Sequence, residues 1–515
     1  MKSRGTPGER GSYRAGVSFG ALSFGAVALL GLVGSIVTAR LFGVKVIGEF
    51  ALASAPTAAL SLLSTVKEQT ALIKELSQLP RRAPRVTGLF YATFAFSQGL
   101  TVLVAGIAAV VVFFVYRGPM HQEHLILPAY ACLAAYTFVG NVCWNFDSVY
   151  SSFVAGRQMF WIRFHEAVMG LVFAILGGIL IPNVWGLVLS AYGAWGTALV
   201  HRTIGVRAFM RFRVARAEIR DGFRTLPLLL GFAVRMAPGM IFAGLSAQST
   251  TWVLGAMSTV SNVGAFNRAQ MLSRKLQEFN QRLVEMLFPT LVSRQATGDS
   301  AGFDRALIDT LRYAAVMMLL LAAGAGGASH TLMKVFGSGF ERADNAFSLL
   351  MLMPAVAAFT LIQSQALFAV NRPTVTSVTA GARLIATVAI SIPATMAFGL
   401  VGPAIGLVVG SCVDMALKAR TLKPHLQTPA HKLWPYRERV ALLAAYVAGF
   451  VVARALDRSM SGYTGLLAAV PLVPLAYGAV FAALGGVNVR DRQRARPLVA
   501  KLRRRLGQRS VPDAV

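Results

Sequence analysis

About fourteen long apolar stretches recur along this sequence, and they constrain the fold more than any other feature. A helix that crosses a bilayer core needs about 20 apolar residues, and these stretches approach or reach that length. The chain is 55% hydrophobic and 14% charged, with a mean hydropathy of +0.59, which is too apolar for a water-soluble surface. We therefore expect an all-α, polytopic membrane protein. The expected spans are 17–39, 48–66, 88–115, 126–150, 164–181, 184–201, 227–253, 260–287, 313–332, 346–369, 375–397, 401–417, 440–453 and 464–484.

The positive charges set the expected orientation. Lys and Arg number 50 against 21 acidic residues, and most lie in segments on the same side of the membrane as the amino terminus. Cations near span ends are retained in the cytoplasm, so we expect a protein of the cytoplasmic membrane with both termini cytoplasmic. The expected regions are a basic N-terminus at 1–16, a six-helix lobe at 17–205, a basic linker at 206–226, a second six-helix lobe at 227–417, a cytoplasmic loop at 418–439, two further helices at 440–486 and a basic tail at 487–515.

Charge, cysteines and motifs exclude several function classes. Because the cations follow the expected topology, much of the positive charge reflects membrane orientation rather than nucleic-acid binding. The basic tail could lie on the anionic lipids of the cytoplasmic leaflet or be a solvated segment that only sets the topology. The three cysteines, Cys132, Cys143 and Cys412, have neither paired nor metal-ligand spacing, so we expect no disulfide framework and no metal site. The sequence has no GxxxxGK phosphate loop, so ATP hydrolysis and a bound cofactor are not expected. Energy would come from an H⁺ or Na⁺ gradient or from substrate mass action.

The two halves of the chain resemble each other at an offset of 216 residues. Gly48-Glu49-Phe50-Ala51 opens the second span, and Gly264-Ala265-Phe266-Asn267 opens the eighth. Trp185-Gly186-Leu187 and Val401-Gly402-Pro403 keep the same offset. Six spans per half make the repeats parallel, related by an axis along the membrane normal, with the last two spans outside the repeat. Two bundles that rock against each other around a central cavity favour a transporter over a channel or an anchor.

Short motifs in both halves resemble those of a known transporter family. Ala39-Arg40-Leu41-Phe42-Gly43, followed by Gly48-Glu49-Phe50-Ala51-Leu52, looks like the opening signature of polysaccharide-export flippases of the multidrug/oligosaccharidyl-lipid/polysaccharide exporter superfamily. The resemblance covers residues 17 to 417. Its second-half motifs are Gly264-Ala265-Phe266, Leu287-Phe288-Pro289, Phe336-Gly337-Ser338-Gly339-Phe340, Asn371-Arg372-Pro373 and Gly399-Leu400-Val401-Gly402-Pro403-Ala404.

This resemblance implies a substrate class as well as a fold. Flippases of this kind move polyprenyl-diphosphate-linked saccharides from the cytoplasmic to the outer leaflet. The diphosphate implies a cationic cavity, and glycan polymerases and glycosyltransferases would be the protein partners of such a step. A multidrug antiporter of the same superfamily is the closest alternative, but it expels organic cations and should line its cavity with acids.

Cations inside the expected eighth span are the first candidate substrate-binding residues. An ionisable side chain at bilayer depth faces a watery cavity or a partner, because exposure to lipid is costly. Arg268, Lys275 and Arg282 recur every seven residues and share one helix face. We interpret them as a cationic ladder for the diphosphate. The alternative is local pairing, because Arg274 and Glu278 are spaced i, i+4, as are Glu278 and Arg282.

Two further intramembrane arginines and one proline complete the proposed cavity. Arg235 lies three residues before Pro238, whose ring permits a kink that could act as a hinge. Arg383, in the expected eleventh span, is the other cation assigned to the cavity. The alternative for Arg235 is a carboxylate partner on a neighbouring helix, and Arg383 could snorkel to the cytoplasmic end of its helix.

Acidic residues at depth are candidates for coupling transport to H⁺ or Na⁺, because burial raises a carboxyl pKa towards neutrality. Asp147, Glu166 and Asp414 are these candidates, together with His165. Each also has a structural interpretation. Asp147 could be solvated at its helix end, Glu166 and His165 could lie at the interface, and Asp414 could pair with Lys418 at i+4.

The sequence also bears on an enzymatic alternative. A membrane glycosyltransferase or polymerase should carry acidic catalytic residues on a sizeable hydrophilic segment, and the loops assigned to the outside are short. An HExxH motif is absent from the sequence. We therefore expect a transporter rather than an enzyme. Tyr130, Tyr136, Trp144 and Tyr150 could stack on sugar rings, although packing and interface anchoring are the commoner roles of membrane aromatics.

Overall fold

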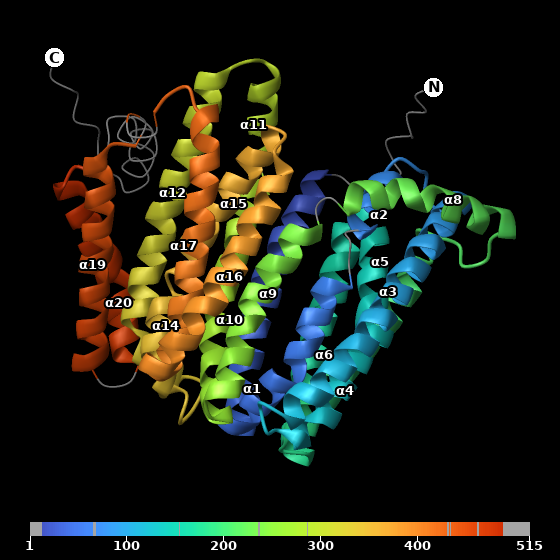
Figure 1. The fold of residues 1–515 in the computed structure, drawn as a ribbon, viewed down its shortest axis with the longest axis horizontal. Coiled ribbons are helices and arrows are strands. Elements are labelled where there is room, and N and C mark those ends of the chain that lie inside the picture. The colour runs from blue at the N-terminus through green and yellow to red at the C-terminus, as the bar shows by residue number, and fades with distance from the viewer. Residues whose placement is uncertain are drawn as a thin grey trace, which may run out of the picture.

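The computed structural model shows an all-helical chain, as the apolar pattern predicts (Figure 1). Over the described residues there is no β-strand. The described residues are 13–64, 68–153, 155–234, 237–285, 287–429, 432, 434–460 and 463–487.

Helix α1 (Tyr13–Leu63) contains the expected first two spans. Its 51 residues would extend about 77 Å at 1.5 Å per residue, more than twice the thickness of a bilayer core. Gly43 interrupts the helical backbone with φ 73° and ψ 171°. Because a side chain strongly disfavours that φ, glycine is the residue suited to this break between the spans.

The first lobe contains the spans that follow α1. One of them is interrupted by a π-helical turn, η2, between α4 and α5, and such turns occur frequently at functional sites. The elements are α3 (Pro84–Arg117), α4 (Ile126–Ala135), η2 (Tyr136–Gly140), α5 (Asn141–Ser152), α6 (Gly156–Leu180) and α7 (Val184–Val206).

The second lobe follows the same order, and two helices, α19 and α20, follow it. Helices α16 and α17 pack closely, because a β-carbon at Gly410 would lie only 2.9 Å from the backbone oxygen of Arg383. The elements are α9 (Ala237–Met257), α10 (Val260–Glu285), α12 (Ser300–Gly327), α13 (Ser329–Lys334), α14 (Asp344–Leu350), α15 (Met353–Ala369), α16 (Pro373–Phe398), α17 (Gly402–Leu422), α19 (Tyr436–Ser459) and α20 (Thr464–Ala483).

Three shorter helices gather at one end of the bundle, the upper end in Figure 1. They are α2 (Glu68–Leu76), α8 (Arg216–Ala233) and α11 (Leu287–Ala296). The expected seventh span started at residue 227, but residues 227–233 belong to α8, and the span starts with α9. Helix α8 carries basic residues among apolar ones, so its apolar residues extended the predicted span towards the amino terminus.

Nine helical segments among the described residues are long and apolar enough to cross a membrane. Two of these, 25–63 and 373–425, each contain two expected spans, so the nine account for eleven. The expected sixth, seventh and eighth spans are α7, α9 and α10, which are not among these nine segments. The chain is therefore a multi-pass membrane protein with two six-helix lobes and two additional helices.

The internal repeat appears in the structure as a reciprocal backbone contact, which we call the glycine seam. A β-carbon at Gly48 would overlap the carbonyl oxygen of Val260, and one at Gly264 would overlap the carbonyl oxygen of Val44. Residues 44 and 260, like residues 48 and 264, are separated by the repeat offset. The two lobes therefore meet at equivalent positions, and glycine permits the close approach.

Candidate functional site

Arg268 of α10 lies against the first lobe. Its Nη1 donates to Ser35 Oγ at 3.0 Å and its Nη2 to Thr38 Oγ1 at 3.4 Å, both on α1. Its Nε is buried without a hydrogen-bond partner. Lys275 is half-buried on the same helix and is engaged in an interaction, whereas the side chain of Arg282 lies outside the described residues. Arg268 therefore bridges the two lobes through neutral oxygens.

Arg274, which we interpreted only as a pairing partner of Glu278, uses neutral acceptors as well. Its Nη2 donates to Gln270 Oε1 at 3.1 Å and to the carbonyl oxygen of Ala247 at 3.3 Å. Arg383 of α16 lies within electrostatic range of Arg274, and its Nε is buried without a hydrogen bond. Within the described part of the chain, neither arginine forms a salt bridge.

Helix α17 lies beside α16, the helix of Arg383, and contributes one acid and one further cation. Lys418 Nζ lies 2.9 Å from Asp414 Oδ2, and both side chains are buried. This is the i, i+4 pairing considered from the sequence. Arg383 lies within electrostatic range of Asp414. We call Arg274, Arg383, Asp414 and Lys418 the second-lobe cluster; it holds three cations and one acid.

Arg268, Arg274 and Arg383 share a further property. Each side chain is half-buried and lies deep among helices. Unpaired cations at such depth are costly unless water or an anion reaches them. The arrangement is therefore suited to hold an anionic group.

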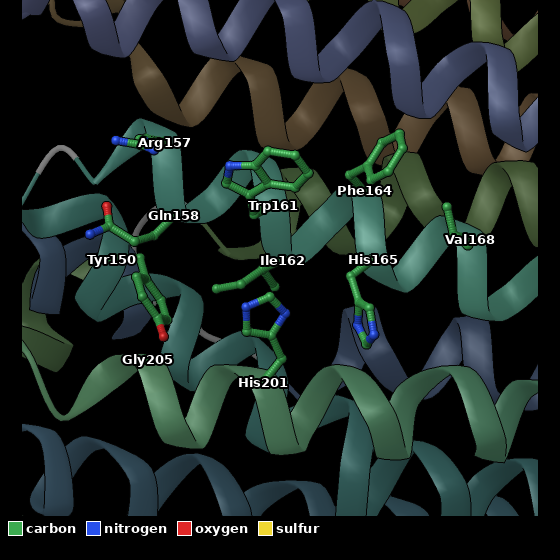
Figure 2. A pocket seen from close by; sticks show the side chains of 10 residues that line it. All are labelled: Tyr150, Arg157, Gln158, Trp161, Ile162, Phe164, His165, Val168, His201 and Gly205. Carbon is green, nitrogen blue, oxygen red and sulfur yellow. The ribbon is translucent and has the colours of Figure 1, made fainter.

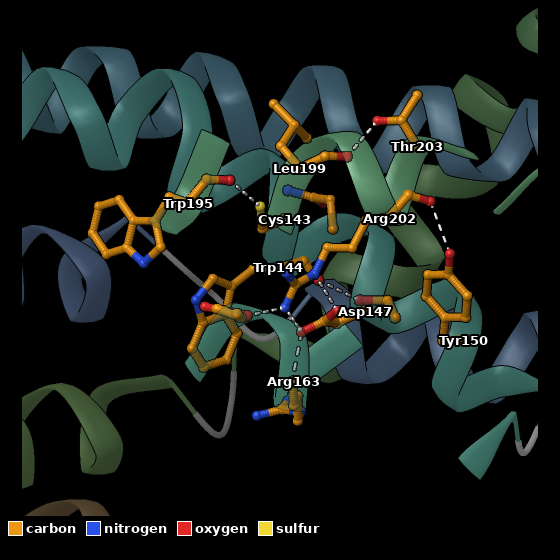
Figure 3. Close-up of polar contacts among 12 residues, drawn as sticks. Cys143, Trp144, Asp147, Tyr150, Arg163, Trp195, Leu199, Arg202 and Thr203 are labelled. Carbon is orange, nitrogen blue, oxygen red and sulfur yellow. Dashed lines mark hydrogen bonds and ion pairs between the residues drawn. The ribbon is translucent and has the colours of Figure 1, made fainter. Parts of the chain in front are cut away.

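The first lobe contains a different group of charges, shown in Figure 3. Arg202 of α7 contacts Asp147 of α5 at 2.8 and 3.3 Å and Glu166 of α6 at 2.9 Å. Arg163 adds a contact of 3.5 Å to Asp147. We call these four residues the first-lobe network. Two cations and two acids make it neutral overall, and the Arg202 side chain is only 4% exposed.

Two of the proposed coupling residues, Asp147 and Glu166, thus meet on the same arginine. The sequence assigned Arg202 to the cytoplasmic segment after the sixth span, so its role was missed. Helix α7 continues to Val206, and the Tyr150 hydroxyl donates to the carbonyl oxygen of Arg202 at 2.8 Å. One signal in the sequence could have found the network: Arg202 lies just beyond an apolar run, one helical turn from Val206.

A cavity of about 600 Å³ lies beside the first-lobe network (Figure 2). His165 of α6 and His201 of α7 line it, with ring centroids 5.3 Å apart. His165 Nδ1 is buried without a hydrogen bond. The two imidazoles therefore form part of the wall of a cavity that adjoins the network.

A second cavity in the first lobe has aromatic and hydroxyl walls and a volume of about 330 Å³. Tyr136 of η2, Trp144 of α5 and Trp195 of α7 line one part, and Ser54 and Thr57 of α1 line another. The Thr57 hydroxyl is buried without a hydrogen-bond partner. Aromatic faces with hydroxyl donors suit a sugar ring, which has both apolar and polar surfaces.

The two remaining aromatic candidates have packing roles. The Tyr130 hydroxyl donates to the carbonyl oxygen of Ala109 at 3.1 Å, and Tyr150 is fully buried against α7. Arg235 lies outside the described residues. Pro238 lies in the first turn of α9, where its ring removes no intrahelical hydrogen bond. The expected kink inside a continuous span is therefore replaced by a boundary between two helices.

No protein-family model matches the sequence, and no curated protein matches it. Solved structures match its fold. The lipid II flippase MurJ, in an inward closed conformation, aligns with a TM-score of 0.66 at 11% identity, over 94% of this chain and 100% of its own. A eukaryotic MATE transporter aligns with a TM-score of 0.50 at 14% identity, over 82% and 97%. A MATE transporter in complex with MaL6 aligns with a TM-score of 0.50 at 12% identity, over 82% and 100%.

These likenesses establish the fold. They confirm the all-helical membrane fold that the sequence predicted. The substrate has to be argued from the residues of this chain.

Proposed function

We propose that this protein translocates a polyprenyl-diphosphate-linked saccharide across the cytoplasmic membrane by alternating access of its two lobes. The observation that carries the proposal is the set of deep arginines, Arg268, Arg274 and Arg383, none of which forms a salt bridge with a carboxylate among the described residues. A diphosphate would supply the missing negative charge. Arginine also offers bidentate contacts to phosphate oxygens.

The aromatic cavity of the first lobe supports the saccharide part of the substrate. Tyr136, Trp144 and Trp195 could stack on a sugar ring while Ser54 and Thr57 bond its hydroxyls. A protein whose fold this chain shares is named as a flippase of lipid II. In our proposal the second lobe attracts the diphosphate and the first lobe receives the sugar.

Charge argues against the multidrug alternative. A cavity for organic cations needs carboxylates with free negative charge. The deep acids considered as candidates, Asp147, Glu166 and Asp414, are each paired with a cation. The paired acids suit coupling instead, because H⁺ or Na⁺ could compete with Arg202 for Asp147 and Glu166. We propose the first-lobe network as the coupling site.

Orientation follows from the same charges. In our proposal α2, α8 and α11 lie on the cytoplasmic side, together with both termini, and the glycine seam lies on the outer side. Glycosyltransferases would then supply the substrate from the cytoplasm, and a glycan polymerase would use it outside.

The proposal is tested by translocation in vesicles. Purified protein is reconstituted with a fluorescent polyprenyl-diphosphate saccharide, and its arrival in the opposite leaflet is measured with an impermeant quencher. We expect Arg274→Ala and Arg383→Ala each to slow translocation by about 10–100-fold, the loss of one charged hydrogen bond of about 1.5–3 kcal/mol.

Arg305→Ala is the matched control, because Arg305 is an exposed arginine of α12 outside the second-lobe cluster. It should translocate at the wild-type rate. Wild-type rates in both cluster variants would refute the proposal, and export of organic cations by the wild type would favour the multidrug alternative.

A further inference from the structure

A large pocket lies at the end of the molecule opposite α2, α8 and α11, near the glycine seam. Its volume is about 780 Å³, within the range of small-molecule sites. Its walls come from the end of the first span, α13, the loop at 337–338, α14, α19 and Tyr463. Helix α19, which lies outside the internal repeat, thus contributes to it together with both lobes.

The acids of this pocket are largely engaged in holding its walls together. Asp457 of α19 accepts the backbone N–H groups of His330 and Thr331 at 3.2 and 3.1 Å, at the start of α13. Asp344 of α14 lies 3.6 Å from Arg454. A carboxylate at a helix start satisfies N–H groups that lack intrahelical partners, so Asp457 is a structural residue.

Three cations of the same pocket keep donors available. Lys334 of α13 and Arg458 of α19 are exposed and have no partner among the described residues. Arg40 donates from Nε to the carbonyl oxygen of Val335 at 2.9 Å and from Nη2 to the Tyr463 hydroxyl at 3.3 Å. Those two contacts fix the Arg40 guanidinium and leave its Nη1 free.

The overall charge of the lining is positive. Arg454 adds a fourth cation, and Glu341 is the third acid, with Oε2 buried and without a hydrogen bond. His330 also lines the pocket, 3.8 Å from Asp344. Four permanent cations against three acids leave an excess of positive charge, and the unpaired cations come from different elements.

We propose that this pocket binds a phosphate-bearing lipid headgroup at the outer surface. The phosphate would contact Lys334, Arg458 and the free Nη1 of Arg40. Its source is either the diphosphate of the transported lipid after crossing, which rests on the proposed function, or the phosphate of an anionic bilayer lipid such as phosphatidylglycerol. The pocket also gives α19 a function beyond the two-lobe repeat.

The test is a binding measurement on the full chain in phosphatidylcholine nanodiscs, with inorganic diphosphate as the probe. Because the deep second-lobe arginines could bind diphosphate too, the titration is made in an Arg268→Ala, Arg274→Ala, Arg383→Ala background. We expect saturable binding that weakens by about 10–100-fold when Lys334→Gln and Arg458→Gln are added, the effect of one charged hydrogen bond or more. Arg305→Gln with Lys432→Gln, two exposed cations elsewhere, should leave the affinity unchanged.

A second arm identifies the source of the phosphate. Nanodiscs containing phosphatidylglycerol should block the diphosphate site if bilayer lipid occupies it, and should leave diphosphate binding intact if the transported headgroup is the ligand. No binding in phosphatidylcholine, or equal affinity with and without Lys334→Gln and Arg458→Gln, overturns the site. Because the readout is binding in a background without the second-lobe arginines, its failure is distinct from a failure of the translocation test.

Discussion

In the first lobe, Arg202 contacts Asp147 and Glu166 at 2.8–3.3 Å, and Arg163 balances the remaining negative charge. In the second lobe, Asp414 contacts Lys418 at 2.9 Å, while Arg274 and Arg383 bond neutral groups or nothing. Both clusters lie within helical bundles of related topology.

The difference separates two uses of intramembrane charge. A neutral, closely bonded network largely compensates its own desolvation, so it holds helices together. A cluster with excess cations is compensated only when an anion or water enters. The uncompensated positive charge therefore lies in the second lobe. The following variants test this contrast between the two lobes.

Arg202→Met should have the largest effect on stability. It removes three charged contacts and leaves two carboxylates close together, so we expect a loss of about 3–5 kcal/mol in the free energy of unfolding. The measurement is denaturant unfolding in detergent. Arg163→Ala is the control, because Arg163 is 51% exposed and such a pair contributes about 0–1 kcal/mol. Equal effects of the two variants would remove the structural role of the network.

Asp414→Asn should have an intermediate effect. It breaks one contact to Lys418 rather than three, so we expect a loss of about 1–3 kcal/mol in the free energy of unfolding. Thermal unfolding followed by size-exclusion chromatography measures the change. A cost as large as that of Arg202→Met would show that the second lobe depends on ion pairing as the first does.

Arg383→Leu should have the smallest effect, with the opposite sign. Replacing a deep, unpaired arginine by an apolar side chain removes a desolvation penalty, so we expect stability to rise by about 1 kcal/mol. Denaturant unfolding of this variant beside wild type gives the sign. A clear destabilisation would mean that Arg383 has a structural partner and would weaken the contrast between the lobes.

Much of the fold could be predicted from the sequence because its strongest determinant is local. The apolar stretches define the spans, and the repeat of Gly48 at Gly264 predicts the two lobes. The start of the seventh span was wrong because α8 carries apolar residues up to Ala233. Hydropathy does not distinguish an amphipathic helix at the end of the bundle from the beginning of a span.

The candidate site was less predictable because it depends on which helices are neighbours. Asp414 and Lys418 share a helix, so their pairing followed from spacing. The meeting of Arg202 with Asp147 and Glu166 joins three helices, and no spacing encodes it. Arg274 is the reverse case: an acid lies at i+4 in the sequence, yet its described contacts are to neutral groups.

The glycine seam bears on the origin of the molecule. In a two-fold interface between identical subunits, every contact between residue i of one subunit and residue j of the other occurs twice, once in each direction. Val44 with Gly264, and Gly48 with Val260, form such a pair of contacts. An ancestral half-length chain could have made this contact as a homodimer. The same valine of each subunit would then have contacted the same glycine of the other. After duplication and fusion, each copy of the pair could diverge independently, and both glycines persist in this chain.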